Sequence, residues 1–119
     1  MTLFKMISVG VDIVSVRRIS FLIEKYGNRF LERVYSKRER NYCNGKKDPP
    51  ICFAGKFAAK EAVIKALSLK NVSLKNIEIL NSDGAPFVVV NGEVINGVSI
   101  SVSHERDFAV AVCAFIKEV

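Results

Sequence analysis

The feature that most constrains the fold is a long helical pattern over residues 51–70, which follows the helix-entry pair Asp48-Pro49. At about 100° per residue, bulky apolar side chains share one broad arc, and alanines cover much of the opposite side. The bulky set is Phe53, Phe57, Val63, Ile64 and Leu67, and the small set is Ala58, Ala59, Ala62 and Ala66. This pattern predicts a helix that is packed nearly all round.

The same helix carries four charged side chains, namely Lys56, Lys60, Glu61 and Lys65. In one interpretation the lysines extend to solvent, and Glu61 and Lys65 form an ordinary helical ion pair. That interpretation would hold for an isolated helix. On a helix with little exposed surface, however, charges are costly unless they have partners. Three cations beside one carboxylate suit a site for phosphate and metal.

Residues 6–13 predict the first strand, because apolar and small or polar side chains alternate along it. The apolar side consists of Ile7, Val9, Val11 and Ile13, and the other side consists of Ser8, Gly10 and Asp12. The second side is small and polar, so we expect something other than the core to approach it. Gly10 would leave room for a bulky ligand beside Asp12.

Two further helices are predicted before the long one. Ser15 can cap a helix over residues 15–26. Ser36 and Glu39 have the spacing of a capping box, which opens a short, charged helix over residues 36–43.

The second half of the chain predicts strands. Residues 77–81 and 87–90 flank Asp83-Gly84, a typical hairpin signal. Residues 98–103 alternate between aliphatic and serine side chains, so we expect one buried face. Residues 108–116 are apolar on both faces and predict a central strand or a strand buried in an interface.

The order of these elements predicts an α+β fold, with an N-terminal strand and helices followed by an antiparallel sheet. A length of 119 residues fits one domain, which we assign to residues 1–119. The apolar start has no small-residue cleavage site and is too short to span a bilayer. We therefore expect a cytoplasmic protein that does not associate with membranes.

The chain is basic, with 18 Lys and Arg against 12 Asp and Glu. This excess predicts an acidic partner, which could be nucleic acid, a phosphorylated small molecule or an acidic protein. The three cysteines, Cys43, Cys52 and Cys113, are odd in number and scattered. They predict neither a disulfide framework nor a metal site, and Cys113 is expected to be a small core residue.

A carboxylate pair formed by Asp12 and Glu61 would suit a magnesium ion. Magnesium takes a few carboxylate oxygens and keeps positions for water and phosphate, so two carboxylates from different elements suffice. The alternative role for Asp12 is to cap the first helix, although Ser15 can do the same. Spacing alone supports the pair weakly, because any two acids could be matched in this way.

Motifs along the whole chain resemble the holo-acyl-carrier-protein synthases, the small group within the 4′-phosphopantetheinyl transferases. They are GVDI at residues 10–13, FAAKEA at 57–62 with Lys65-Ala66, SVSH at 101–104 and FAVA at 108–111. Each motif is modest alone, but their order and spacing together are specific. FAAKEA is the strongest of them.

The resemblance implies roles for particular residues. Asp12 and Glu61 would bind Mg²⁺, and Lys65 would lie beside the diphosphate of coenzyme A, so that Glu61 and Lys65 are the expected catalytic residues. Lys56 and Lys60 would hold phosphates of coenzyme A. His104 would line the substrate site and Arg18 would contact the carrier protein, and these two complete the expected set. The family also implies a homotrimer with sites at the subunit interfaces.

The implied reaction transfers the 4′-phosphopantetheine group from coenzyme A to a serine of an apo acyl carrier protein, in fatty acid biosynthesis. It is Mg²⁺-dependent and releases adenosine 3′,5′-bisphosphate. Either Glu61 or a metal-bound water could accept the serine proton.

Two other classes of function fit parts of the sequence. A small basic nucleic-acid-binding module fits the net charge and the arginines of residues 29–40, but the chain has no known binding motif and no basic strand with interleaved aromatics. We therefore expect no nucleic-acid partner. A non-catalytic, trimeric interaction domain would keep the strands but would not need Asp12.

Overall fold

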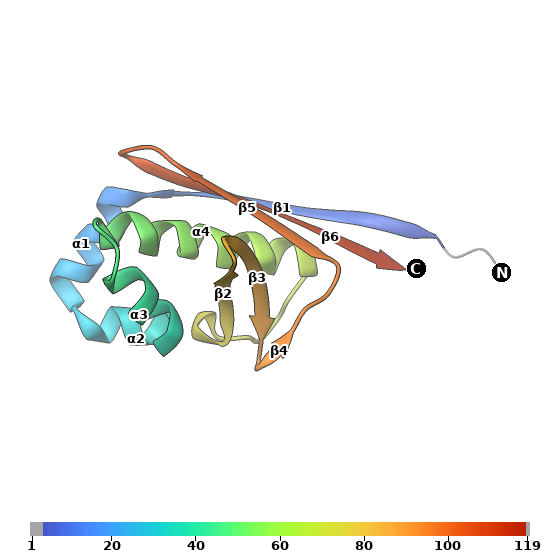
Figure 1. The fold of residues 1–119 in the computed structure, drawn as a ribbon, viewed down its shortest axis with the longest axis horizontal. Helices are drawn as coiled ribbons and strands as arrows, with labels where there is room; N and C mark the ends of the chain where they lie inside the picture. Colours follow the sequence, from blue (N-terminus) through green and yellow to red (C-terminus); the bar gives the residue numbers. More distant parts are fainter. Residues whose placement is uncertain (1–3, 119) are drawn as a thin grey trace.

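The computed structural model describes residues 4–118. Helix α4 (Pro49–Leu67) packs against a three-stranded antiparallel sheet, as Figure 1 shows. The strands of this sheet lie in the order β1 (Lys5–Ser15), β6 (Phe108–Glu118) and β5 (Val98–His104). The predicted strand over 108–116 corresponds to β6. It is central, because β1 pairs with one of its edges and β5 with the other.

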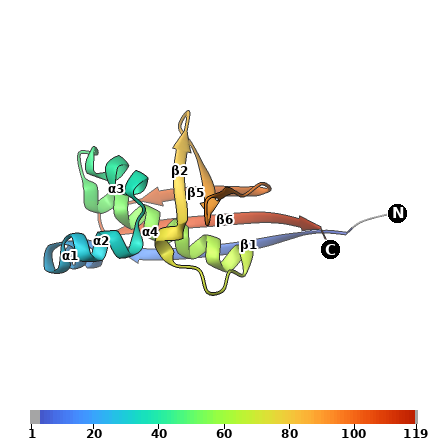
Figure 2. The same ribbon diagram turned by 90° about the horizontal axis from the view of Figure 1, so that it is seen from below.

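A second antiparallel sheet lies beside α4. It consists of β2 (Ile77–Ser82), β3 (Ala85–Val90) and the short β4 (Glu93–Val94), in that order. The predicted hairpin turn at Asp83-Gly84 joins the first two strands, and the 3-10 helix η1 (Leu74–Asn76) precedes them. Figure 2 shows this hairpin rising steeply away from α4. The predicted α+β fold is confirmed.

Helix α1 (Val16–Tyr26) begins as predicted, because the Ser15 hydroxyl accepts a backbone N–H of its first turn. It ends at Gly27, which has a φ of 57°. The sequence did not predict α2 (Asn28–Val34), which starts directly after that glycine. This short helix has no side-chain cap, and two apolar side chains hold it on the core. These buried residues are Leu31 and Val34.

Helix α3 (Lys37–Asn44) opens with the predicted capping box. The Ser36 hydroxyl accepts the backbone N–H of Glu39 at 3.3 Å, and the Glu39 carboxylate accepts the backbone N–H of Ser36 at 2.9 Å. Helix α4 also starts at the predicted place, where the Asp48 carboxylate accepts the backbone N–H of Ile51 at 3.5 Å. Local capping chemistry thus sets both helix starts.

Gly10 has a different role from the one the sequence suggested. A Cβ atom at Gly10 would lie 2.1 Å from the Ala62 carbonyl oxygen and 2.8 Å from the Ala66 backbone nitrogen. The space beside Gly10 is therefore filled by the backbone of α4, and no ligand can enter it. The expectation that Gly10 makes room for a ligand is wrong, because the glycine instead lets strand and helix touch.

The other side of β1, with its four large aliphatic residues, faces away from α4 and is exposed. The exposed fractions are 69% for Ile7, 59% for Val9, 52% for Val11 and 62% for Ile13. The central strand adds Phe108, Val112 and Ile116, which are 40–54% exposed. We call this surface the bare sheet face. A contiguous apolar surface of this kind is typical of a protein–protein interface.

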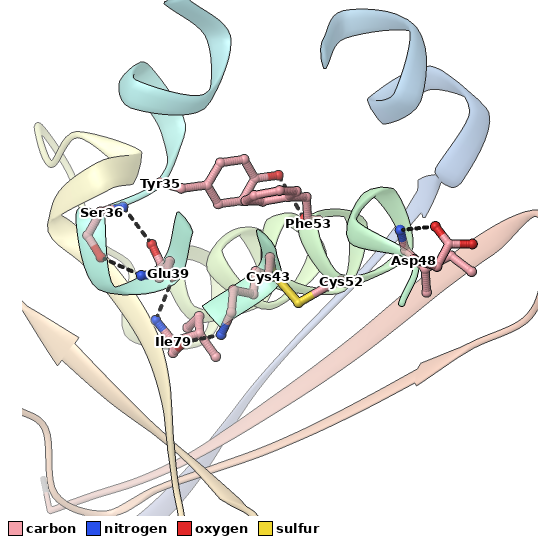
Figure 3. The surroundings of a disulfide bond; sticks show 10 residues. Tyr35, Ser36, Glu39, Cys43, Asp48, Cys52, Phe53 and Ile79 are labelled. Carbon is pink, nitrogen blue, oxygen red and sulfur yellow. Dashed lines mark hydrogen bonds between the residues drawn. A yellow bond between two sulfur atoms is a disulfide. The ribbon is translucent and has the colours of Figure 1, made fainter. Parts of the chain in front are cut away.

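The cysteine prediction is partly wrong. Cys43 at the end of α3 is bonded to Cys52 in the first turn of α4, with 5.4 Å between their Cα atoms (Figure 3). The chain reverses direction between the two helices, which brings cysteines nine residues apart in sequence into contact. Cys113 is free and buried, as expected.

Two further expectations concern the domain and the membrane. The assignment of one domain to residues 1–119 stays a prediction, since residues 1–3 and residue 119 lie outside the described part. Within the described part, the helices are too short or too polar to cross a membrane.

Candidate functional site

The structure brings Asp12, Glu61 and Lys65 together between β1 and α4. Lys65 Nζ lies 3.6 Å from Asp12 Oδ1 and donates a hydrogen bond of 2.8 Å to the Val11 carbonyl oxygen. Glu61 lies one turn before Lys65 on the same helix and is close enough to feel the charge of Asp12. Three of the residues singled out in the sequence thus form one cluster, which we call the carboxylate cluster.

Electrostatics within the carboxylate cluster favour a bound cation. Partial burial raises the pKa of Glu61, the negative charge of Asp12 raises it further, and Lys65 lowers it. Two carboxylates that repel each other in a partly desolvated place are stabilised when a positive ion joins them. Lys65 alone provides one positive charge against two negative ones.

The donor set fits a magnesium ion. In residues 4–118 no group of three or more His, Cys, Asp or Glu side chains comes together, so a metal site enclosed by protein ligands is not formed there. Magnesium does not need such a cage, because it is commonly bound by one or two carboxylates together with waters and substrate phosphates. Asp12 and Glu61 are therefore suitable ligands for Mg²⁺.

A cleft of about 620 Å³ lies on the other side of α4. Its walls come from α3, the loop before α4, α4 itself, the β2–β3 hairpin and strand β5. Its polar and charged lining includes Tyr42, Lys46, Asp48, Lys56, Asn81 and His104. Lys56 and His104, which were both predicted to bind substrate, thus line the same cleft. The basic loop was the only sign in the sequence that Lys46 lies at a binding site. Nothing in the sequence indicated this for Tyr42, because its position depends on how α3 packs.

Lys56 is almost completely buried at this cleft. Its ammonium donates a hydrogen bond to the Ile79 carbonyl oxygen of β2 and lies 4.7 Å from the centre of the Tyr42 ring. Burial lowers the pKa of Lys56 to about 8, although the charge of Glu39 opposes this shift. Lys56 is therefore a cation that is easily neutralised and that an anion in the cleft would stabilise.

Lys60 does not reach the cleft. Its side chain is 0% exposed, and its ammonium donates to Glu39 Oε1 at 2.6 Å, to the Leu74 carbonyl at 2.8 Å and to the Ile77 carbonyl. An ammonium has three N–H donors, so all of them are occupied. The expectation that Lys60 holds a phosphate of coenzyme A is not supported by this geometry, because the charge is neutralised inside the protein.

The last two expected site residues are on the surface. His104 is exposed at the end of β5 and lines the cleft. Arg18 is exposed on α1 and lies in neither the cleft nor the carboxylate cluster. Phe21, one turn further along α1, is 56% exposed, and Lys25 lies 5.7 Å from the centre of its ring. These three residues share one face of α1, and nothing in the sequence pattern points to Phe21 or Lys25.

The carboxylate cluster and the cleft lie on opposite sides of α4. At about 100° per residue, Glu61 points about 140° and Lys65 about 180° away from Lys56. The sheet shows the same separation, because Asp12 is on β1 at one edge and His104 is on β5 at the other, with β6 between them. Figure 2 shows these two edge strands on either side of β6.

Comparison with known proteins agrees with this fold and with these motifs. The model of the 4′-phosphopantetheinyl transferase superfamily matches residues 8–113. A holo-[acyl-carrier-protein] synthase of Leptospira biflexa is 41% identical over 125 residues, covering 95% of this chain and 98% of the relative.

Solved structures are similar over nearly the whole chain. A holo-(acyl-carrier-protein) synthase from Bacillus anthracis, in complex with CoA (3′,5′-ADP), has a TM-score of 0.80 and 36% identity, covering 96% of this chain and 99% of that one. The Helicobacter pylori synthase in complex with coenzyme A has a TM-score of 0.79 and 35% identity, covering 92% and 99%.

The chain belongs to the 4′-phosphopantetheinyl transferase superfamily. Within it, the chain falls in the group of enzymes named holo-[acyl-carrier-protein] synthases, so the family resemblance noted in the sequence is confirmed.

Proposed function

We propose that this enzyme transfers the 4′-phosphopantetheine group of coenzyme A to a serine of an apo acyl carrier protein, in a Mg²⁺-dependent reaction that releases adenosine 3′,5′-bisphosphate. The observation that carries the proposal is the convergence of Asp12, Glu61 and Lys65 between β1 and α4 in a member of this family. We place the reaction in fatty acid biosynthesis and in the cytoplasm, as the family resemblance suggests.

The reaction breaks a phosphoanhydride bond of coenzyme A and forms a phosphate ester bond to the carrier. The carrier's serine oxygen forms a bond to the phosphorus on the pantetheine side of the diphosphate. The bond from that phosphorus to the bridging oxygen breaks, and adenosine 3′,5′-bisphosphate leaves with the electron pair. The serine proton passes to a base, for which either the Glu61 carboxylate or a water in the site is suitable.

Asp12 and Glu61 would hold the magnesium ion, which supplies positive charge to the diphosphate when bound. Lys65 reaches the same place from α4 and would neutralise charge on the departing phosphate. Burial around Glu61 strengthens these electrostatic effects, because a partly dry site screens charge less than water does.

The cleft suits the nucleotide portion of coenzyme A. Its lining combines apolar surface with the cations Lys46 and Lys56, and His104 lies at its margin. Phosphate groups are commonly bound by such lysines acting as point charges. We therefore assign Lys46, Lys56 and His104 to coenzyme A binding, and Lys60 to a structural role.

The separation of the two half-sites favours an oligomer with active sites at the subunit interfaces, and the family resemblance implies that this oligomer is a homotrimer. The cleft and the carboxylate cluster of one chain lie on opposite sides of α4, so one ligand would have to pass around the helix to contact both. A neighbouring copy that packs against the bare sheet face could bring its own half-site into register. Burial of that apolar face would also remove a large exposed hydrophobic surface from water.

The test of the proposed function is direct. The purified protein is incubated with coenzyme A, MgCl₂ and an apo acyl carrier protein, and the carrier is analysed by mass spectrometry. The expected result is a mass increase of one phosphopantetheine group that depends on the divalent ion. A carrier that keeps its apo mass under all conditions would overturn the proposal.

The exposed face of α1 formed by Arg18, Phe21 and Lys25 suits docking of the carrier. It presents positive charge around one exposed aromatic ring, which is a common composition at protein interfaces. Acyl carrier proteins are acidic around the modified serine, so the charges are complementary. Arg18 is therefore proposed as a carrier contact.

Charge reversal at this face tests the docking proposal. Arg18→Glu is expected to raise the KM for the carrier roughly five- to tenfold, because it replaces attraction by repulsion in the encounter. Coenzyme A affinity should stay nearly unchanged. Moderate salt should weaken the wild type toward the variant, because exposed charges are screened over about 10 Å at 0.1 M ionic strength.

Lys70 provides a matched control, since it is exposed beyond the end of α4. Lys70→Glu changes the net charge by the same amount, so it separates local docking from general attraction. Equal effects of the two substitutions on the carrier KM would show that α1 is not the docking face.

A further inference from the structure

Glu39 is a completely buried carboxylate that the reaction itself does not use. It accepts hydrogen bonds from the Ser36 backbone N–H at 2.9 Å, from Lys60 Nζ at 2.6 Å and from the Ile79 backbone N–H at 2.9 Å. Its partners belong to the start of α3, to α4 and to β2, so one side chain joins three elements. Figure 3 shows the carboxylate between Ser36 and Ile79.

The three elements joined by Glu39 are walls of the cleft. Helix α3 supplies Tyr42, helix α4 supplies Gly55 and Lys56, and strand β2 supplies Ile79 and Asn81. One turn after Glu39, the Cys43–Cys52 bond ties the same face of α3 to α4. The position of α3 against α4 is thus fixed at two successive turns of α3, by an ion pair at the first turn and a disulfide bond at the second.

Ile79 links Glu39 directly to Lys56. The Ile79 N–H donates to Glu39, and the Ile79 carbonyl oxygen accepts from the Lys56 ammonium. A change at Glu39 therefore acts on the residue that orients Lys56. Within residues 4–118, the Lys56 ammonium has no hydrogen-bond partner other than the Ile79 carbonyl oxygen.

We propose that Glu39 is a positioning residue for coenzyme A binding and acts through Lys56. This inference rests on the proposed function, since it takes the cleft to be the coenzyme A site. Glu39 keeps the Ile79 carbonyl in place and supplies a buried negative charge beside the Lys56 ammonium. Lys60 neutralises only part of that charge, so the carboxylate still favours the protonated form of Lys56.

The charge of Glu39 matters because Lys56 is close to losing its proton at physiological pH. Burial lowers the pKa of Lys56 to about 8, Glu39 raises it, and Lys60 and Lys46 lower it. Removal of the Glu39 charge would lower this pKa further. A larger fraction of Lys56 would then be neutral at pH 8, and a neutral amine attracts phosphate weakly.

The pH dependence of coenzyme A binding is affected by the other charged or titratable groups around Lys56. Those on α3 and the following loop, on α4, and on β5 at the cleft are Glu39, Tyr42, Lys46, Asp48, Lys60 and His104. Strand β2 contributes the Ile79 carbonyl and the side chain of Asn81, neither of which titrates. Substitution of Glu39 leaves all the other groups in place.

Isothermal titration of coenzyme A at several pH values tests the inference. Glu39→Gln keeps the shape of the side chain and removes its charge. We expect its coenzyme A affinity to fall about three- to tenfold relative to the wild type at pH 8, and less than about twofold at pH 6.5. The ratio of variant to wild type is compared at each pH, so titration of the ligand's own phosphate cancels.

Two further variants separate this role from a merely structural one. Tyr35→Phe removes the buried hydrogen bond of 2.7 Å from Tyr35 Oη to the Phe53 carbonyl, in the same core, and should lower stability with no change in the pH profile. Lys56→Arg carries a charge that does not titrate in this range, and in the Glu39→Gln background it should remove the loss of affinity at high pH.

Glu39→Gln leaves Lys60 buried without its charged partner, which could prevent folding. The double variant Glu39→Gln with Lys60→Met removes both charges and is used in that case. Glu39 raises the pKa of Lys56 more than Lys60 lowers it, so the double variant should show a smaller shift in the same direction.

The outcomes are distinct. A wild-type protein that binds coenzyme A, together with Glu39 variants that lose affinity equally at all pH values or not at all, would overturn the inference alone. A wild-type protein that binds no coenzyme A at any pH would overturn the proposed function and this inference with it.

Discussion

Replacement of Asp12 by alanine or of Glu61 by glutamine is expected to lower the rate of phosphopantetheine transfer by about 10²-fold or more. The reason is that each substitution removes one of the two carboxylates that would hold magnesium beside Lys65. A bound metal stabilises developing negative charge by several kcal/mol, and each 1.4 kcal/mol corresponds to about a tenfold change in rate. The transfer assay with saturating coenzyme A measures this loss.

Metal binding gives a readout that does not depend on turnover. Mn²⁺ can substitute for magnesium at such oxygen sites and is detected by electron paramagnetic resonance. Wild-type protein should bind Mn²⁺, and Asp12→Ala and Glu61→Gln should bind it at least about tenfold more weakly. Thermal unfolding of the variants without metal should stay near that of the wild type, because neither carboxylate is in the buried core.

Lys65→Ala is the matched comparison for these variants. It removes the cation of the carboxylate cluster but neither of its carboxylates. We expect Mn²⁺ binding to be retained while turnover falls more than coenzyme A affinity, because charge on the leaving phosphate grows toward the transition state. If Asp12→Ala or Glu61→Gln keeps near-wild-type turnover in magnesium, the shared-metal hypothesis is wrong.

Local chemistry made much of the fold predictable from the sequence. The caps at Ser15, Ser36 and Asp48 act over three residues, so their patterns are visible without knowledge of the tertiary structure. The hairpin at Asp83-Gly84 is likewise encoded by neighbouring residues. The strand over 108–116 is apolar on both faces, which predicted a central strand or one buried in an interface, and in the structure it is central.

Features that depend on long-range packing were not predictable in the same way. Lys60 and Glu39 are 21 residues apart, and their pairing exists only because α3 folds against α4. In the sequence Lys60 and Lys56 are both lysines on a largely apolar helix, but Lys60 is buried in the core and Lys56 borders a cleft. Gly10 misled for a similar reason, since a small residue can admit either a ligand or a neighbouring backbone.

The carboxylate cluster was identified by its motifs more than by physical pattern. Spacing alone cannot select Asp12 and Glu61 from the 12 acidic residues of the chain. Their convergence depends on contact between β1 and α4, which Gly10 permits. The separation of this cluster from the cleft was also invisible in the sequence, because it follows from which faces of α4 meet β1 and β5.

Mixed oligomers of two inactive variants are expected to regain activity if each active site combines two chains. One variant, Asp12→Ala, lacks a carboxylate of the cluster and keeps an intact cleft. The other, Lys46→Glu with His104→Ala, has a damaged cleft and an intact cluster, and both of its substitutions are at exposed positions. Each variant alone should have very low transfer activity.

If the two variants are present in equal amounts and assemble at random into a cyclic oligomer, roughly a quarter of the interfaces combine an intact cluster with an intact cleft. Coexpression of the two variants should therefore restore about a quarter of the wild-type activity per site. Asp12→Ala coexpressed with Glu61→Gln is the control, because both variants damage the same half-site and should stay inactive together. No recovery in the mixture despite assembled oligomers would show that one chain builds the whole site and that the bare sheet face serves another purpose. Recovery in the control would show that the Asp12 and Glu61 of one working site come from different chains, which would contradict the carboxylate cluster of a single chain.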